Sequence, residues 1–324
     1  MKHGIRKLMA LLCVTGALII SGCGSDTAGT QTAKPAEVHF TYVKAPLNIP
    51  SIVEKQEGLF EKAFAEDAVK VGYSTITEGP KQTEAMAAGD IDIANALGGT
   101  SAILAKANGV DLRIVSMYSR APKAFVIVAK DPSITSVADL KGKTVMGPKG
   151  TNLHQLLLMA LAEQGMQASD VNFVSGGIPQ AAAAMENGSA DAALLAGPMA
   201  LKALQSGAHV VRDAQGLLNA TIVIAVRGDF LDKHPELVKR FLATHYGVVD
   251  AYKKNPTQAY TLAAKETGLT EKEVATMAPW YDFNPQVTEE DIKDLEKAQD
   301  FLVQAGLLDA NKKVDVRSMF VAVQ

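Results

Sequence analysis

The sequence predicts an α/β protein of two lobes, each a mostly parallel sheet flanked by helices, with a ligand cleft between the lobes. Two observations support this fold class. Short apolar runs alternate with Ala-rich segments from residue 37 onward. In addition, one spaced pattern of Pro, Met, Gly, Asp and Gly occurs twice, 99 residues apart. Strand–helix alternation is typical of a parallel sheet with helices on both faces.

The individual elements follow from apolar periodicity and from start and stop signals. Strands are expected at 38–43, 69–74, 91–96, 112–117, 125–129, 144–146, 171–174, 192–195, 210–211 and 221–226. Helices are expected at 51–65, 81–88, 101–108, 152–164, 180–187, 199–205, 235–252 and 287–307. The last helix has a clear N-terminal signal, because Thr288 precedes three acidic residues.

The internal repeat consists of five matches without a gap. Pro80, Met86, Gly89, Asp92 and Gly98 recur as Pro179, Met185, Gly188, Asp191 and Gly197. Proline suits a first helical turn, and glycine suits the left-handed position after a helix. Any two strand–helix units share some prolines at helix starts and glycines at helix ends, but the constant spacing of 99 residues favours two equivalent lobes. The two aspartates are interpreted as local caps rather than as a carboxylate pair across the cleft.

The domain boundaries follow from the repeat. Residues 37–120 and 227–324 are expected to form a discontinuous first lobe, and residues 121–226 the second. The crossings between lobes, which serve as hinges, are placed at 119–124 and 225–228. Ligands of open α/β sheets bind at the carboxyl ends of the strands, so the facing edges of the two lobes predict the cleft.

The first residues have the composition of a bacterial lipoprotein signal at 1–22. Lys2, Arg6 and Lys7 precede an apolar run of 13 residues, which ends in Ile20-Ser21-Gly22-Cys23. This order resembles a lipobox, in which the cysteine is acylated. An ordinary cleaved signal with an incidental cysteine is the alternative. Residues 23–36 have no large apolar side chain and are expected to form a flexible tether.

Composition and motifs exclude several function classes. Without Lys2, Arg6 and Lys7 the chain has 29 basic and 35 acidic residues, which gives no electrostatic basis for nucleic-acid binding. Only Cys13 and Cys23 are thiols. Gly142-Lys143-Thr144 ends like a phosphate-binding loop, but position 137 is Val instead of Gly. The histidines form no metal-ligand pattern, so neither a metal nor a cofactor is expected.

Four loop–helix junctions have the character of anion sites. They lie at 77–80, 98–101, 149–154 and 176–179, and each has glycine where a strand leads into a helix. Free backbone N–H groups and the helix dipole favour an anion at such a junction. Ordinary helix capping is the alternative for each of them, and their placement at one predicted edge favours binding.

Several segments resemble the nitrate/sulfonate/taurine-type solute-binding proteins of ABC importers. They are Gln56-Glu57-Gly58-Leu59-Phe60, Ala87-Ala88-Gly89-Asp90-Ile91-Asp92-Ile93-Ala94, Ser136-Val137-Ala138-Asp139-Leu140-Lys141-Gly142-Lys143, the 149–154 segment and Tyr281-Asp282-Phe283-Asn284-Pro285. The resemblance implies a periplasmic-binding-protein-like fold of type II that closes on its ligand without catalysis. It also implies a monomer, tethered outside the cytoplasm, that meets an ABC permease and its ATPase.

The resemblance places the ligand-binding residues on the loops at the cleft. They are Lys44, Asn48, Thr77, Gly79, Gly98, Gly99, Thr100, Ser101, Tyr118, Arg120, Thr151, Asn152, His154, Gly177, Gln180 and Gly197, and the lipidated residue is Cys23. Many sulfonate-binding members have an aromatic residue shortly before a proline where this chain has Ala196-Gly197-Pro198. This smaller wall suits a ligand bulkier than a plain alkylsulfonate.

Arg120 is the expected anchor of the anion, because a guanidinium holds two oxyanion oxygens at once. A solvated hinge residue is the alternative for this position. For the whole protein, three other functions remain open: a receptor for a pyrimidine or other heteroaromatic ligand, an enzyme on the same fold, and a sensor subunit that reports ligand to a membrane kinase.

Overall fold

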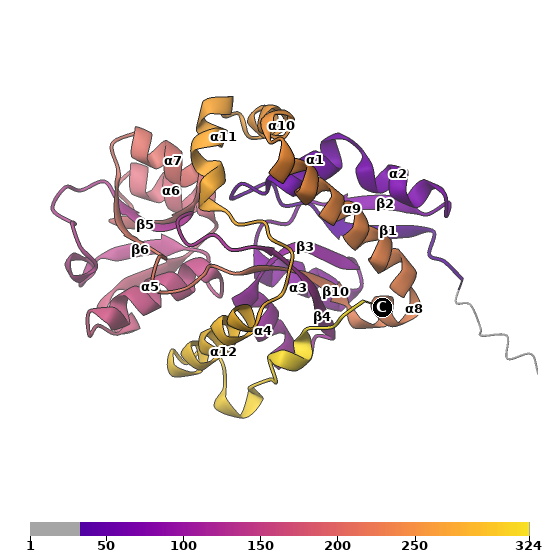
Figure 1. Cartoon of the computed structure of the whole chain (residues 1–324). Coiled ribbons are helices and arrows are strands. Elements are labelled where there is room, and N and C mark those ends of the chain that lie inside the picture. Colours follow the sequence, from indigo (N-terminus) through magenta and orange to yellow (C-terminus); the bar gives the residue numbers. More distant parts are fainter. Residues whose placement is uncertain (1–32, 324) are drawn as a thin grey trace, which may run out of the picture. The chain divides into compact units, whose positions relative to one another are not determined.

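Two five-stranded sheets form the framework of the computed structural model, which describes residues 33–323 (Figure 1). The first sheet has the order β2-β1-β3-β10-β4, and the second has the order β7-β6-β8-β5-β9. The strands of the first sheet are β1 (Glu37–Thr41), β2 (Lys70–Ser74), β3 (Ile93–Gly98), β4 (Leu112–Ser119) and β10 (Ile222–Arg227). Those of the second are β5 (Phe125–Ala129), β6 (Thr144–Gly147), β7 (Asn172–Ser175), β8 (Ala192–Ala196) and β9 (His209–Asp213).

The two sheets have the same topology. Strands β2, β1, β3, β10 and β4 of the first occupy the places of β7, β6, β8, β5 and β9 in the second. In each sheet four strands are parallel and one is antiparallel to its neighbours, which is β10 in the first and β5 in the second. The prediction of two equivalent α/β lobes with mostly parallel sheets is therefore confirmed.

The antiparallel strand of each sheet is the one that enters from the other lobe. The chain leaves the first lobe after β4 and begins β5, and it leaves the second lobe after β9 and begins β10. Both crossings connect the sheet edges where parallel strands end. A strand that starts at this edge has to run away from it, so its direction is opposite to that of its neighbours.

The strand order corrects the predicted lobe boundary. Residues 222–226 were assigned to the second lobe, but they form most of β10 in the first sheet. The second crossing therefore lies between Asp213 and Ile222, and the expected hinge at 225–228 is wrong because those residues end β10 and begin a helix. The connection from β4 to β5 lies within 119–124, so the first crossing is where it was expected.

The repeated aspartates have the same role in both lobes. The Asp92 carboxylate accepts the backbone N–H of His39 at 2.9 Å, and the Asp191 carboxylate accepts that of Thr144 at 2.8 Å. Each contact satisfies an N–H group of the neighbouring parallel strand, in the middle of β1 and at the start of β6. The expectation that each aspartate caps the turn entering its own strand is therefore wrong, because the N–H group that it accepts lies on a neighbouring strand, 53 and 47 residues away in the sequence.

Helices flank both sheets. In the first lobe they are α1 (Ile49–Gln56), α2 (Leu59–Ala65), α3 (Gly79–Ala88) and α4 (Gly99–Ala107), and in the second α5 (Asn152–Glu163), α6 (Ile178–Glu186) and α7 (Gly197–Gln205). The later chain forms α8 (Gly228–Lys233), α9 (Pro235–Lys254), α10 (Thr257–Thr267), α11 (Glu271–Met277) and α12 (Glu289–Gln304). The helix expected at 51–65 is two helices, because Gly58 between them has a left-handed φ of 59°.

The first lobe is completed by helices from the end of the chain, as expected. Phe241 of α9 stacks on Phe60 of α2 with 4.6 Å between ring centroids, and both rings contact Phe40 of β1 at 5.0 Å. All three side chains are almost fully buried. Thr288 caps α12 through a reciprocal pair of hydrogen bonds with Asp291, which confirms the predicted N-terminal signal. Among residues 33–323, no helix is long and apolar enough to cross a membrane.

Candidate functional site

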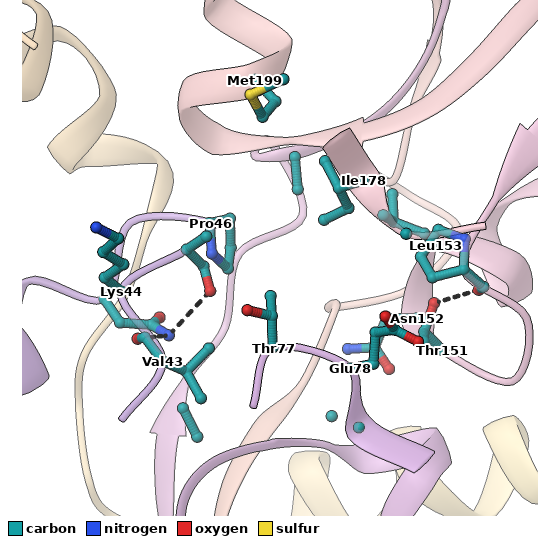
Figure 2. A pocket seen from close by; sticks show the side chains of 18 of the residues that line it. Val43, Lys44, Pro46, Thr77, Glu78, Thr151, Asn152, Leu153, Ile178 and Met199 are labelled. Carbon is teal, nitrogen blue, oxygen red and sulfur yellow. Dashed lines mark hydrogen bonds between the residues drawn. The ribbon is translucent and has the colours of Figure 1, made fainter. Parts of the chain in front are cut away.

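A cavity of about 490 Å³ lies between the two lobes, at the carboxyl ends of the parallel strands. Its lining includes Val43, Lys44 and Thr77 from the first lobe and Thr151, Leu153 and Met199 from the second (Figure 2). Phe125 and Ile222, the first residues of the two antiparallel strands, also line it. The cavity thus occupies the position that the fold predicts for a ligand, with walls from both lobes.

Six helices begin at this cavity. Their N-cap residues all line it: Asn48 of α1, Glu78 of α3, Gly98 of α4, Thr151 of α5, Gly177 of α6 and Ala196 of α7. None of the six N-cap side chains accepts a hydrogen bond from its own helix, whereas α11 and α12, which start elsewhere, are capped by threonines. In α1 the Ser51 N–H instead donates to the Tyr118 hydroxyl at 3.2 Å.

Uncapped helix N-termini offer N–H groups and a partial positive charge to an anion. Other helices of this chain also begin without a side-chain cap, so a missing cap does not by itself identify a site. The convergence of six such N-termini on one cavity is the feature that distinguishes this place. Four of the six N-termini are the junctions predicted from the sequence, and the other two are those of α1 and α7.

Three charged side chains line the cavity in the part of the chain that the structure describes. Lys44 comes from the loop after β1, Lys202 from α7 and Glu78 from the start of α3. The Lys44 ammonium lies 3.5 Å from the Glu266 carboxylate and donates to the Glu266 carbonyl at 3.3 Å. Lys202 was not predicted, because it sits in the second turn of a helix, and the rotation of that helix decides whether the residue faces the cavity.

Apolar side chains form much of the remaining wall. Phe125, Leu153, Ile178, Met199 and Ile222 contribute from the strands and helices around the cavity. Ala196 and Pro198 also line it, and both are small. The site therefore combines donors for an anionic group with a dry surface for an organic body.

Direct contacts join the two lobes beside the cavity. The Thr100 hydroxyl donates to the Asn152 side-chain oxygen at 3.0 Å, and the Asn152 amide donates to the Thr221 carbonyl at 2.9 Å. The Ser101 hydroxyl donates to the Gly150 carbonyl at 3.1 Å. Asn152 thus contacts the first lobe and the second crossing at once, so it holds the lobes together in this conformation.

Ten of the predicted ligand-binding residues line the cavity. They are Lys44, Asn48, Thr77, Gly79, Gly98, Ser101, Thr151, Asn152, Gly177 and Gln180. Gly99, Thr100, Tyr118, Arg120, His154 and Gly197 do not belong to the lining. Gly99 and Gly197 instead permit close approach, since a Cβ on Gly197 would lie 2.1 Å from the Pro46 carbonyl oxygen across the cleft.

Arg120 contradicts the expectation that it anchors an anion. Its Nε and Nη2 atoms donate to the two carboxylate oxygens of Asp291 at 2.5 Å each. Its other N–H groups donate to the carbonyl oxygens of Asn284 at 3.0 Å and Gln286 at 2.9 Å. Because these donors are engaged, Arg120 links the first crossing to the start of α12 and to the loop before it. Its guanidinium cannot bind two ligand oxygens at the same time.

Tyr118 belongs to a buried polar network behind the cavity. Its hydroxyl is 2.9 Å from the Ser51 hydroxyl oxygen, which accepts from the Asn95 amide at 3.2 Å. Asn95 also donates to the Glu54 carboxylate at 2.9 Å, and the other Glu54 oxygen lies 2.6 Å from Nδ1 of His245. Tyr118 was expected in a ligand-binding loop after a strand at 112–117, but it lies within β4, is fully buried and does not line the cavity.

His154 shapes the loop before α5. Its Nδ1 atom accepts the Gly150 backbone N–H at 3.3 Å, and its ring stacks on Phe173 with 4.4 Å between centroids. Burial, assisted by the charge of Lys149, lowers the pKa of His154 to about 4. The imidazole is therefore neutral near pH 7, which is the state in which Nδ1 can accept.

Two sequence predictions concern residues or features away from the cavity. Cys23, like the signal at 1–22 and most of the tether at 23–36, lies outside the described residues. Within residues 33–323, no cluster of His, Cys, Asp or Glu has the arrangement of a metal site.

The family model and the relatives that match this chain point to the same kind of protein. The family model described as NMT1/THI5 like matches residues 46–259. The chain is 30% identical over 315 residues to a protein of Escherichia coli (strain K12) named for aliphatic sulfonate binding, with 94% of each chain covered. A Bacillus subtilis (strain 168) protein named in the same way is 28% identical over 323 residues, with 98% of this chain and 94% of the relative covered.

Solved structures agree with these relatives. The alkanesulfonate-binding protein from Xanthomonas axonopodis pv. citri bound to MOPS superposes with a TM-score of 0.81, 24% identity and coverage of 90% of this chain and 99% of that one. The periplasmic aliphatic sulphonate binding protein from Escherichia coli gives 0.76 at 27% identity, with 90% and 94% covered. These relatives are binding proteins and not enzymes, in agreement with the sequence prediction. The matched region contains all six helix starts at the cavity, and the chain belongs to the NMT1/THI5-like family.

Proposed function

We propose that this chain is an extracytoplasmic solute-binding lipoprotein of an ABC importer, which binds a small organic anion of the sulfonate class and delivers it to the permease. The observation that supports the anionic ligand is the convergence of six uncapped helix N-termini on the cavity between the lobes. In a partly buried site each terminus stabilises a nearby negative charge by up to about 2 kcal/mol. The relatives named for sulfonate binding support the same class of ligand.

The organic part of the ligand follows from the apolar wall. A cavity of about 490 Å³ lies within the ordinary range for small-molecule sites and is far larger than an inorganic ion requires. The small Ala196 and Pro198 at one wall leave room beside Met199 for a ring. We therefore favour a sulfonate with a bulky apolar or cyclic body over nitrate or a short alkylsulfonate.

A neutral or heteroaromatic ligand, such as a pyrimidine, is the second candidate. It is favoured by the absence of any arginine from the cavity lining within the described residues, since arginine is the usual partner of a buried oxyanion. It is disfavoured by Lys44 and Lys202, which place one cation from each lobe at the cavity.

Titration calorimetry of the purified chain, freed of co-purifying ligand, tests the proposal. The panel contains MOPS, a short alkylsulfonate, taurine, nitrate and an aminopyrimidine. We expect MOPS to bind more tightly than the short sulfonate and nitrate to bind least. Binding of the aminopyrimidine alone would overturn the anion assignment in favour of the second candidate.

The lipid anchor has its own test and an internal control. Cys23→Ala removes the acylated residue of the lipobox-like sequence and should move the protein from the membrane fraction to the soluble one. Cys13→Ala changes a thiol inside the apolar run, ahead of the cleavage site, and should leave the protein membrane-bound. Equal fractionation of the two variants would show that Cys23 is not the anchor.

A further inference from the structure

The cavity has one acidic side chain among its many donors. Glu78 is the N-cap residue of α3 and lines the cavity between the two lobes (Figure 2). Within the described residues no other carboxylate belongs to the lining. A negative charge at a site made of helix N-termini repels a purely anionic ligand. The presence of Glu78 in the lining therefore has to be explained by a structural role or by the ligand.

Helix capping does not supply that reason. Glutamate is not a favoured N-cap residue, and the Glu78 side chain makes no capping hydrogen bond to α3. Within residues 33–323 the one hydrogen-bond partner of its carboxylate is Lys81, whose ammonium lies 2.9 Å away on the same helix. The Lys81 side chain is 62% exposed, and an ion pair of this kind compensates little of the carboxylate charge.

The carboxylate faces the second lobe. Its Oε1 atom lies 3.5 Å from the point where a Cβ on Gly177 would stand, and the Gln180 side-chain oxygen lies 2.5 Å from the same point. Glu78 belongs to the first lobe and Gln180 to the second, and both line the cavity. Two acceptor oxygens thus converge from opposite walls on a space that only a glycine leaves open.

We infer that Glu78 is a specificity-determining residue, which together with Gln180 selects ligands that carry a protonated amine beside their anionic group. A cation between the two oxygens would neutralise the Glu78 carboxylate, while the sulfonate group takes the free helix N-termini. The inference rests on the proposed function and narrows it from organic sulfonates to zwitterionic aminosulfonates.

A matched pair of ligands isolates the amine. MOPS carries a ring nitrogen that can be protonated, whereas cyclohexylpropanesulfonate has a ring of similar size and no nitrogen. Calorimetry below neutral pH, where the MOPS amine is charged, should show that the wild-type protein prefers MOPS by roughly tenfold. Glu78→Gln should remove this preference by weakening MOPS, and the amine-free sulfonate should bind that variant at least as tightly as it binds the wild type.

Two further variants serve as controls. Glu84→Gln makes the same change of charge on an exposed residue of α3 outside the cavity lining, and it should keep the wild-type preference. Lys81→Gln removes the ammonium that pairs with Glu78, so the preference for MOPS should persist or increase. Thermal melting without ligand verifies that all three variants are folded.

The outcomes separate the two levels of the proposal. If both sulfonates bind and the preference for MOPS survives Glu78→Gln, or is absent from the wild type, the inference about Glu78 is wrong and the sulfonate assignment stands. If neither sulfonate binds the wild-type protein, the proposed function fails and the inference fails with it.

Discussion

Substitution of Gly197 by alanine should hold the two lobes apart. Gly197 begins α7 in the second lobe and has a left-handed φ of 52°. An added Cβ would stand 2.1 Å from the carbonyl oxygen of Pro46 and 2.6 Å from its carbonyl carbon, both in the first lobe. These are backbone atoms, so a side-chain rotation cannot relieve the contact.

The size of the effect follows from these distances. Carbon and carbonyl oxygen approach to about 3.3 Å at closest, so the walls must separate by about 1 Å at this point. A separation of that size stretches the hydrogen bonds from Thr100 to Asn152 and from Ser101 to Gly150 beyond their useful length. At about 1 kcal/mol each, their loss weakens the closed state by about 2 kcal/mol, which is roughly 30-fold in ligand affinity.

Gly165→Ala is the matched control. Gly165 also lies in the second lobe with a left-handed φ, of 69°, but a Cβ there meets no atom within 4 Å. Both substitutions should lower the unfolding free energy by about 1 kcal/mol through backbone strain, and only Gly197→Ala should weaken ligand binding. Calorimetry with MOPS gives the affinity, and small-angle scattering with and without MOPS gives the closure. Equal affinity and equal compaction in the two variants would refute the argument that this contact sets the closed state.

Two further predictions concern Arg120 and His154. Arg120→Ala leaves the Asp291 carboxylate, which is 2% exposed, without its partner, so it should lower the unfolding free energy by about 3–5 kcal/mol and leave ligand affinity unchanged. Chemical denaturation measures this loss. The control Arg113→Ala breaks a pair whose acidic partner is exposed and should cost about 1 kcal/mol or less. A fall in affinity without a fall in stability would instead return Arg120 to the ligand site. The pKa of His154 is lowered to about 4 in the folded protein, from about 6.5 in the unfolded chain. Between these two pH values only the unfolded chain binds a proton at this residue. The free energy of unfolding is therefore highest above pH 6.5 and decreases as the pH falls toward 4. Wild type should therefore lose about 3 kcal/mol more than His154→Gln across this window, and parallel pH profiles of the two would contradict the assignment.

The fold was predictable because its signals are local. Each strand is a short apolar run, and the equivalent residues 99 positions apart mark the same helix and strand boundaries in both lobes, as Gly89 and Gly188 do with their left-handed φ angles. The lobe assignment of β10 was not predictable in this way. An apolar run such as 222–226 fits either sheet, and only the position of its neighbours in space decides which one it joins.

The same distinction explains the site. The helix starts at Gly98, Thr151 and Gly177 were found because a strand–loop–helix junction is visible in consecutive residues. The role of Arg120 was not found, because its partner Asp291 is 171 residues away in the sequence. An arginine beside a predicted cleft suggests a ligand contact unless the acid that neutralises it is known.

The cleft divides its polar groups between two tasks. Side chains such as Thr100, Ser101 and Asn152 bind the opposite lobe or the crossing, whereas the helix starts direct the positive ends of their dipoles toward the cavity. Some N–H groups at these starts are already engaged, since those of Gly99 and Gly197 donate to the Thr221 and Ala124 carbonyl oxygens. The helix dipoles at the cavity depend little on the identity of the side chains around them, so they do not by themselves distinguish one organic anion from another. Discrimination among ligands then falls to the few charged side chains that reach the cavity and are neutralised only by an exposed partner. In this chain the residue that best meets that description is Glu78, which makes its charge the first place to look for what distinguishes this protein's ligand from those of its relatives.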